Sequence, residues 1–188
     1  MSVRALVLLA VVALGILLVD QLAKFLVVTE LEVGQTVPVL GEVLQLHFVK
    51  NSGAAFSLAS GFTWILSLVA VGVIVAIVVF AKRIKSVGWA WMLGLLLGGA
   101  LGNVSDRLFR EPSFGQGHVI DFIELWGFPA IFNVADIAIC TAMGLFLLLT
   151  LRGVRLDGAM ASDTIERVPA PGAADPAGAT EAPEASKE

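Results

Sequence analysis

The chain has 188 residues, of which 57% are hydrophobic and 15% charged, and its mean hydropathy is +0.90. Such a composition leaves too little polar surface to cover a soluble globule and indicates a membrane protein. The net charge of −4 arises in the C-terminal residues 157–188, where seven acidic and two basic side chains sum to −5. The rest of the chain is close to neutral and has no basic stripe, which argues against a nucleic-acid partner.

Four apolar stretches are long enough to span a bilayer, since a helix rising about 1.5 Å per residue needs roughly 20 apolar residues to cross the hydrocarbon core. In chain order they cover residues 5–28, 60–80, 86–105 and 133–151. The first follows Arg4 in the manner of a cleaved signal sequence, but Asp20 and Lys24 continue it at i, i+4 spacing. We therefore interpret it as a retained span and expect one membrane domain over residues 1–156.

Lysine and arginine flank these stretches at three places. They are Arg4 at the start, Lys82, Arg83 and Lys85 after the second stretch, and Arg152 and Arg155 after the fourth. Positive residues beside a span stay on the cytoplasmic side, and four spans bring all three places to one face of the membrane. Both termini are therefore expected in the cytoplasm, and residues 29–59 and 106–132 outside.

The segment between the first two spans contains an alternating pattern. Leu44, Leu46 and Phe48 occupy every second position after Pro38 and Gly41, which predicts a short strand or hairpin on the membrane surface. The predicted fold class is therefore an all-α membrane protein with four transmembrane helices and a small extracytoplasmic β element.

Two further stretches carry a recognisable composition. The third span contains Gly94, Gly98 and Gly102 at four-residue spacing, a pattern that lets helix backbones approach closely in lipid. The acidic tail, residues 157–188, is rich in Ala, Pro, Glu, Asp, Gly and Ser and lacks apolar periodicity. Such a segment cannot offset the entropy of folding, so we expect a disordered C-terminal tail on the cytoplasmic side.

Ionisable residues inside an apolar span cost at least about 2.5–3.5 kcal/mol each on insertion scales, which makes them candidates for function. Six ionisable residues from different parts of the chain, some inside the spans and some beside them, are expected at one depth near the outer face. Three asparagines are expected at the same depth. The ionisable residues are Asp20, Lys24, Asp106, Arg107, Asp121 and Asp136, and the asparagines are Asn51, Asn103 and Asn133. A single Asp or Asn in such a place is more often a helix cap or an interfacial charge, but six together indicate a polar site.

Asp121 and Asp136 form the most complete catalytic set. Cys140 is the single cysteine and has no evident histidine partner, and His47 and His118 lack metal-ligand spacing, so no metal site is expected. Two carboxylates close together in a low dielectric share one proton. One can then accept a proton from an attacking water while the other donates to the scissile carbonyl, which predicts aspartyl proteolysis.

Five segments resemble the motifs of a known family. They are Asp20 with Lys24, the run Asn51-Ser52-Gly53-Ala54-Ala55-Phe56-Ser57, the run Gly98-Gly99-Ala100-Leu101-Gly102-Asn103-Val104-Ser105-Asp106-Arg107, then Val119-Ile120-Asp121-Phe122 and Phe132-Asn133-Val134-Ala135-Asp136. In this order on four spans, across nearly all of residues 5–151, the chain resembles the lipoprotein signal peptidases, also called signal peptidase II.

The resemblance implies an aspartic endopeptidase of the bacterial inner membrane, with Asp121 and Asp136 as its catalytic pair. Its implied substrates are the signal peptides of prolipoproteins, cut just before a cysteine that carries diacylglycerol, with membrane lipid as part of recognition. The residues implied to bind substrate or to support the site are Asp20, Lys24, Asn51, Gly53, Asn103, Asp106, Arg107, Asn133 and Ala135. No cofactor is expected, and the chain is expected to act as a monomer.

Two other functions fit parts of the pattern. A small ion-coupled membrane transporter also places Asp, Arg and Asn side chains within a helical bundle, although usually near the midplane and with internal repeats. A purely structural scaffold would leave the shared depth of the costly residues unexplained. Cleavage of a lipidated prolipoprotein peptide by the purified protein discriminates among the three.

Overall fold

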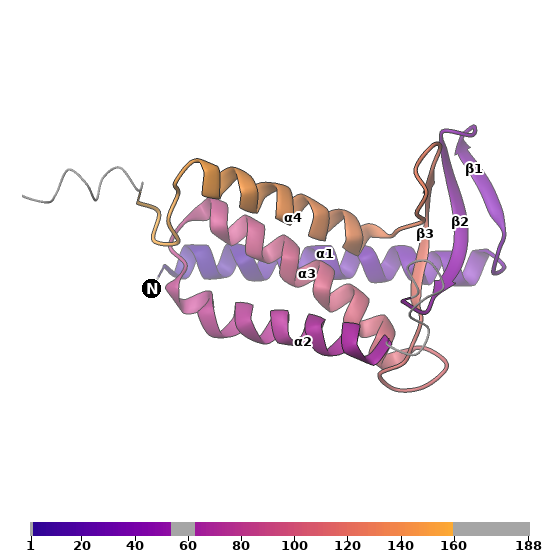
Figure 1. Cartoon of the computed structure of the whole chain (residues 1–188), viewed down its shortest axis with the longest axis horizontal. Helices are drawn as coiled ribbons and strands as arrows, with labels where there is room; N and C mark the ends of the chain where they lie inside the picture. The colour runs from indigo at the N-terminus through magenta and orange to yellow at the C-terminus, as the bar shows by residue number, and fades with distance from the viewer. Residues whose placement is uncertain (1, 54–62, 160–188) are drawn as a thin grey trace, which may run out of the picture.

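The computed structural model describes residues 2–53 and 63–159. Four long helices run along one bundle (Figure 1): α1 (Val3–Glu30), α2 (Thr63–Phe80), α3 (Val87–Phe109) and α4 (Val134–Leu151). A short 3-10 helix, η2 (Ala81–Arg83), joins α2 to α3. All four long helices are apolar and long enough to cross a membrane, which confirms the predicted spans.

The helix bounds differ from the predicted ones by a few residues. α1 begins and ends two residues beyond the predicted stretch, and α3 continues to Phe109, so the helix carries Asp106 and Arg107 within its last turns. Residues 60–62 of the second predicted span, and Ala54 to Ser57 of the second motif, lie outside the described residues.

α3 is the central helix of the bundle, because it contacts α1, α2 and α4. An added Cβ at Gly98 would lie 2.6 Å from the Ala13 carbonyl oxygen of α1, and one at Gly99 would lie 2.6 Å from the Ala135 carbonyl oxygen of α4. Glycines on two sides of α3 therefore admit two neighbouring backbones. This confirms the close packing predicted from the glycine spacing.

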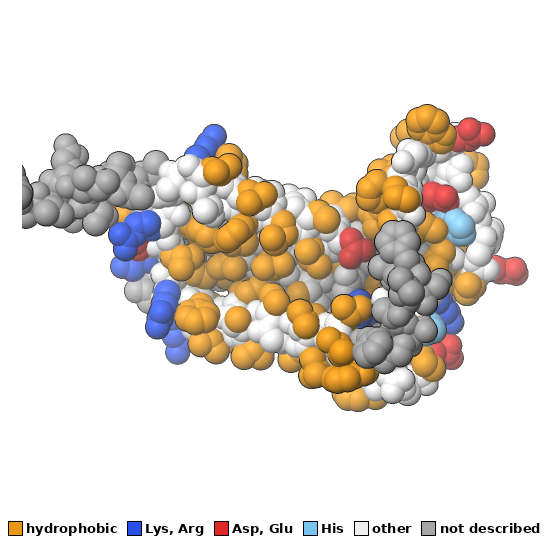
Figure 2. Space-filling view, viewed as in Figure 1, with side chains coloured by type: hydrophobic (Ala, Val, Ile, Leu, Met, Phe, Trp, Pro, Cys, Tyr) orange, Lys and Arg blue, Asp and Glu red, His pale blue; other side chains and the backbone are white. Residues whose placement is uncertain are grey.

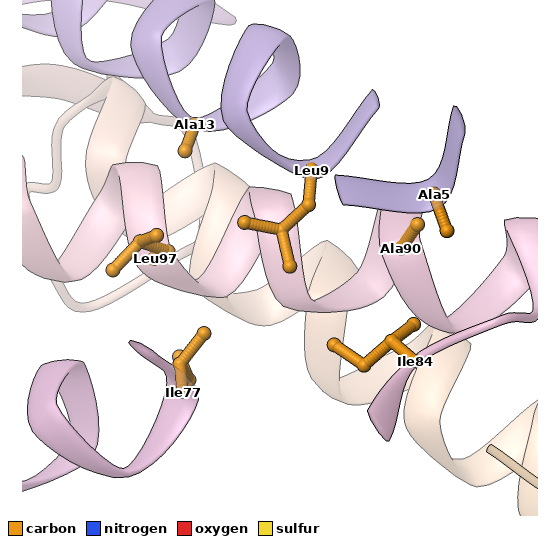
Figure 3. Close-up of a cluster of buried hydrophobic side chains, with 7 residues drawn as sticks. All are labelled: Ala5, Leu9, Ala13, Ile77, Ile84, Ala90 and Leu97. Carbon is orange, nitrogen blue, oxygen red and sulfur yellow. The ribbon is translucent and has the colours of Figure 1, made fainter. Parts of the chain in front are cut away.

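A cluster of buried side chains closes the contact between α1, α2 and α3 away from the polar residues. Figure 3 shows small residues of α1 facing α3, with isoleucines filling the space below them; the cluster comprises Ala5, Leu9, Ala13, Ile77, Ile84, Ala90 and Leu97. Many other apolar side chains on the helices are exposed, and Figure 2 shows them spread along the flank of the bundle. A surface of that kind is suited to lipid.

A three-stranded antiparallel sheet lies across the end of the bundle opposite the N-terminus (Figure 1). Its order is β1 (Thr36–Leu40), β2 (Leu44–Asn51) and β3 (Val119–Leu125). The predicted hairpin is confirmed as β1 and β2. β3 was not predicted as a strand, and it is the strand that carries Asp121, opposite Val49 of β2.

β3 forms because Val119, Ile120, Phe122 and Ile123 favour a strand and bury apolar area there. Ile120 and Phe122 pack with Phe48 of β2 and Val27 of α1 in one buried cluster. That cluster fixes the sheet on the C-terminal end of α1. The strand's position, and with it the position of Asp121, is therefore set by packing against the bundle.

At the other end of the bundle, the segment after α4 folds back onto the loop before α3. The Leu156 carbonyl accepts hydrogen bonds from the backbone N–H groups of Lys85 (2.9 Å) and Ser86 (3.1 Å), and Trp89 Nε1 donates to the Val154 carbonyl (2.9 Å). Residues 157–159 continue this turn. The acidic tail was predicted to be disordered. Its residues 160–188 lie outside the described part of the chain.

Candidate active site

Five different elements deliver polar side chains to the sheet end of the bundle. Asn51 ends β2, Asp121 lies within β3, Asn103 lies in the C-terminal half of α3, and Asn133 and Asp136 begin α4. Hydrogen bonds join these side chains, so the structure brings together the carboxylates and asparagines that the sequence predicted at one depth. α1 supplies the charged layer beneath them.

Asp121 is 3% exposed and is held by an amide on each carboxylate oxygen. Asn51 Nδ2 donates to Oδ2 at 2.7 Å, and Asn133 Nδ2 donates to Oδ1 at 2.6 Å. Burial raises the pKa of Asp121 to about 6, and the charge of Asp136 adds to the rise, while the amide donors and Lys24 oppose it. The side chain is therefore able to hold or release a proton near neutral pH.

Asp136 sits in the first turn of α4 as part of a reciprocal cap. The Asn133 side chain accepts from the Asp136 N–H (3.0 Å), and Asp136 Oδ2 accepts from the Asn133 N–H (3.2 Å). Asn103 Nδ2 donates to the other oxygen, Oδ1, at 2.8 Å. Asn133 and Asp136 thus have two roles: they cap the N-terminus of α4, and they place the Asp136 carboxylate next to Asn103.

Asn133 connects the two aspartates. Its side-chain Nδ2 bonds Asp121, while its backbone N–H and side-chain Oδ1 bond Asp136. Asn133 is fully buried, so these contacts are shielded from solvent. One buried residue thereby contacts both carboxylates, one on a strand and the other on a helix.

A buried charge cluster lies directly below. Lys24 is paired with Asp20 and with Asp106, each at 2.8 Å, and all three side chains are fully shielded from solvent. Asp20 also accepts from the Ala135 N–H at 2.9 Å, and so ties α1 to the first turn of α4. Asp106 accepts from the Ile120 N–H at 3.2 Å, which ties α3 to β3. The cluster therefore positions both elements that carry the aspartates.

Two members of this cluster, Arg110 and Gln21, were not predicted from the sequence. Arg110 Nε lies 2.6 Å from Asp106 Oδ1, and Gln21 Nε2 donates to Asp20 (3.2 Å) and to the Gly102 carbonyl (3.1 Å). The spacing of Arg110, four residues after Asp106 on one helix, was a signal that could have identified it. Gln21 gave no such signal, because a glutamine beside an aspartate has no distinctive spacing.

Two further predicted residues, Gly53 and Arg107, have distinct local roles. Gly53 has a φ of +86° and its N–H donates to Asn51 Oδ1 at 2.8 Å, which orients the Asn51 amide toward Asp121. Arg107 Nη1 reaches the Asn103 carbonyl at 3.4 Å, while its buried Nε has no hydrogen-bond partner among the described residues. The Arg107 side chain also borders a hollow beside Asp121, where a guanidinium group can donate hydrogen bonds to a carbonyl oxygen.

Two adjoining hollows meet at Asn51 and Asp121. One, of about 550 Å³, runs along α4 and is mainly apolar; its walls include Phe128, Phe132, Asp136, Ile137, Cys140 and Thr141. The other, of about 600 Å³, runs toward α2 and α3 and includes Lys50, Gly53, Leu66 and Arg107. Both aspartates therefore border open space, and the apolar arm lies on the exposed flank of α4.

His47 and Cys140 were the other side chains considered for chemistry, and neither bonds the two aspartates in the described part of the chain. His47 pairs with Glu124 at 2.9 Å on the sheet, and Cys140 is exposed on α4. Within residues 2–53 and 63–159, no group of three His, Cys, Asp or Glu side chains is placed to hold a metal ion.

Four membrane spans, with two carboxylates held together at one end beneath a small sheet, define a polytopic membrane protein with a polar site that opens along its flank. Residues 12–152 match the family model of signal peptidase (SPase) II, and the chain belongs to this family. The family removes signal peptides from prolipoproteins, so the chain is a protease of the bacterial inner membrane, and the transporter alternative is set aside.

Individual relatives agree with the family. The chain is 64% identical to the lipoprotein signal peptidase of Leifsonia xyli subsp. xyli, over 84% of this chain and 73% of that one. It is 48% identical to the lipoprotein signal peptidase of Rhodococcus jostii, over 80% and 76% of the two chains. A solved bacterial membrane enzyme, determined in meso at 1.9 Å resolution, is similar with a TM-score of 0.67 and 27% identity over 76% of this chain and 91% of that one.

Proposed function

We propose that Asp121 and Asp136 are the catalytic pair of an aspartic endopeptidase. The observation that carries this proposal is the shared Asn133, which bonds both carboxylates at the junction of two open hollows. The pKa of Asp121, raised by burial to about 6, supports it further, because one member of the pair must hold a proton while the other is ionised.

In the first half of the reaction, the ionised carboxylate accepts a proton from water as the water oxygen bonds to the scissile carbonyl carbon. The protonated carboxyl donates its proton to the carbonyl oxygen, which gives a neutral tetrahedral diol. In the second half the C–N bond breaks. The leaving nitrogen takes the proton that came from water, and a diol O–H returns the other proton to its carboxylate, so the pair ends in its starting state.

The substrate is proposed to be a prolipoprotein cut just before its diacylglyceryl-modified cysteine. The mainly apolar hollow along α4 supports this, because its walls combine Phe128 and Ile137 with the carboxylates, and it adjoins the lipid-facing flank. The more polar hollow offers Lys50 and Arg107 for backbone carbonyls. One arm is thus suited to acyl chains or an apolar peptide segment, and the other to the polar peptide beyond it.

The proposed orientation places both termini in the cytoplasm and the site at the outer face, with one chain acting alone. Figure 2 shows Lys and Arg side chains gathered at the bundle end that carries the N-terminus, opposite the sheet. Positive residues are retained on the cytoplasmic side, which supports an outward-facing sheet. All the side chains of the proposed site come from a single chain.

The test is cleavage of a lipidated prolipoprotein peptide by purified Asp121→Asn and Asp136→Asn variants. Each change removes one acid–base group and keeps the side-chain size, so we expect turnover to fall by at least about 100-fold while the folded yield is retained. Asp157→Asn, at the opposite end of the bundle, is the matched control and should keep normal turnover. Near-normal turnover in either site variant would contradict the paired mechanism.

A further inference from the structure

Lys24 uses its whole donor capacity on three acceptors beneath the proposed catalytic pair. Its Nζ lies 2.8 Å from Asp20 Oδ2, 2.8 Å from Asp106 Oδ2 and 3.1 Å from Asn103 Oδ1. An ammonium group has three N–H donors, so each has one partner. Two of the three contacts balance charge. The third contact, to the neutral amide of Asn103, balances no charge. It connects the charge cluster to the proposed pair.

That third contact decides which way the Asn103 amide faces. Asn103 Oδ1 accepts from Lys24 Nζ and from Asn133 Nδ2 (3.2 Å), and both donors are buried. If the amide were turned over, its NH2 would face an ammonium and another NH2. With the oxygen held on that side, Nδ2 faces Asp136 Oδ1 and donates to it at 2.8 Å. Lys24 of α1 therefore helps to set the orientation of the Asn103 amide.

We propose that Lys24 is a positioning residue for the reaction: its ammonium group holds the Asn103 amide so that this amide donates to Asp136. This inference rests on the proposed catalytic pair. Lys24 touches neither carboxylate of the pair and acts on Asp136 through Asn103. The role differs from holding α4 and β3 in place, because Asp20 already links α1 to α4, and Asp106 links α3 to β3, through backbone N–H groups.

A second effect follows from charge. Lys24 favours the ionised form of Asp121 by Coulomb attraction, against the opposing effect of Asp136. The charged groups that surround the pair come from every packed element: Asp20 and Lys24 on α1, Lys50 on β2, Asp106, Arg107 and Arg110 on α3, and Asp136 on α4. Loss of the Lys24 charge should therefore raise the pH at which Asp121 takes up its proton.

The experiment uses full-length protein in an Asp20→Asn background. Lys24→Met in the natural chain would leave two buried carboxylates short of a cation, and such a change can prevent folding. In the Asp20→Asn background, Asp106 keeps Arg110 as its partner, so Lys24→Met leaves no unpaired buried charge. Four proteins form a cycle: the background, Lys24→Met, Asn103→Ala, and both changes together. Cleavage of a lipidated prolipoprotein peptide is measured at equal folded concentration.

We expect Lys24→Met to lower kcat about tenfold with KM almost unchanged when Asn103 is present, and to have little further effect when Asn103 is already alanine. We also expect the acid limb of the rate profile to move to higher pH in Lys24→Met. Arg110→Gln is the matched control, because it removes a cation from the same Asp106 without a bond to Asn103. Its acid limb should stay in place.

Equal fold losses on Lys24→Met in both Asn103 backgrounds would overturn the proposal, since the lysine would then act independently of Asn103. An acid limb that does not move, or that moves equally in Arg110→Gln, would overturn it as well. These outcomes leave the Asp121→Asn and Asp136→Asn tests untouched. Failure of the inference is therefore distinguishable from failure of the catalytic pair.

Discussion

Asp121 has a raised pKa in the folded protein because its carboxyl group is buried. Burial raises its pKa from 3.8 to about 6, so in the folded protein the carboxyl keeps its proton where an unfolded chain has already released it. A group with a raised folded-state pKa contributes stability below its unfolded pKa and loses it as the pH rises through the folded one. The window here runs from 3.8 to about 6.

Stability should therefore fall between about pH 4 and pH 6.5 and then level off, by up to about 3 kcal/mol from this residue. Asp121→Asn, which cannot ionise, should match the natural chain near pH 4 and be more stable above pH 7. Thermal unfolding in detergent, followed by tryptophan fluorescence across this range, measures the difference. A stability difference that is the same at both ends of the range would show that ionisation of Asp121 is not its cause.

At the residue scale, the sequence identified side chains that the structure brings together where an ionisable side chain is costly in an apolar setting. Asp20, Lys24 and Asp136 stand out inside helices that the structure confirms. Asp121 was predicted at the same depth as these residues, but the strand that carries it was not predicted. The pairing of Arg110 with Asp106, and the direction of the Asn103 amide, depend on contacts between distant segments, and no local pattern encodes those.

At the element scale, the helices were predictable because about 20 consecutive apolar residues have few other structures available in lipid. β3 was not predictable in the same way. Its first four residues, Val119 to Phe122, are all buried. The alternation of buried and exposed side chains that identifies a half-exposed strand is therefore missing. Burial on both faces arises because the strand lies between β2 and the bundle, a tertiary contact that the local sequence does not show.

Gly98 tests the packing of α1 against α3. A Cβ there would lie 2.6 Å from the Ala13 carbonyl oxygen and 2.7 Å from the Ile16 Cβ, so Gly98→Ala should separate the helices and cost about 1–3 kcal/mol. Gly72→Ala on α2 is the matched control, because a Cβ at Gly72 meets nothing within 4 Å and alanine favours a helix. Thermal unfolding of the two variants gives the comparison. Similar melting temperatures would contradict the tight contact.

At the scale of the whole molecule, the proposed orientation can be tested with reporters placed in turns that tolerate insertion. Gly41 and Gly115 have φ angles of +59° and +78° and open space around them, at the sheet end of the protein. Reporters there should register outside, and reporters after Lys85 or Ala159 inside, because the Lys and Arg residues fix the spans. A cytoplasmic signal at Gly115 would reverse the proposed direction of the site.

The reciprocal cap that begins α4 also bears on how the protein is made. Asn133 and Asp136 reach the site only when the last span has been inserted and its first turn has formed against the Asp20 carboxylate. A nascent chain with three spans in the bilayer holds Asp121 without its partner. Under the proposed mechanism, such a chain is latent, so proteolysis begins only after membrane biogenesis of the enzyme is complete.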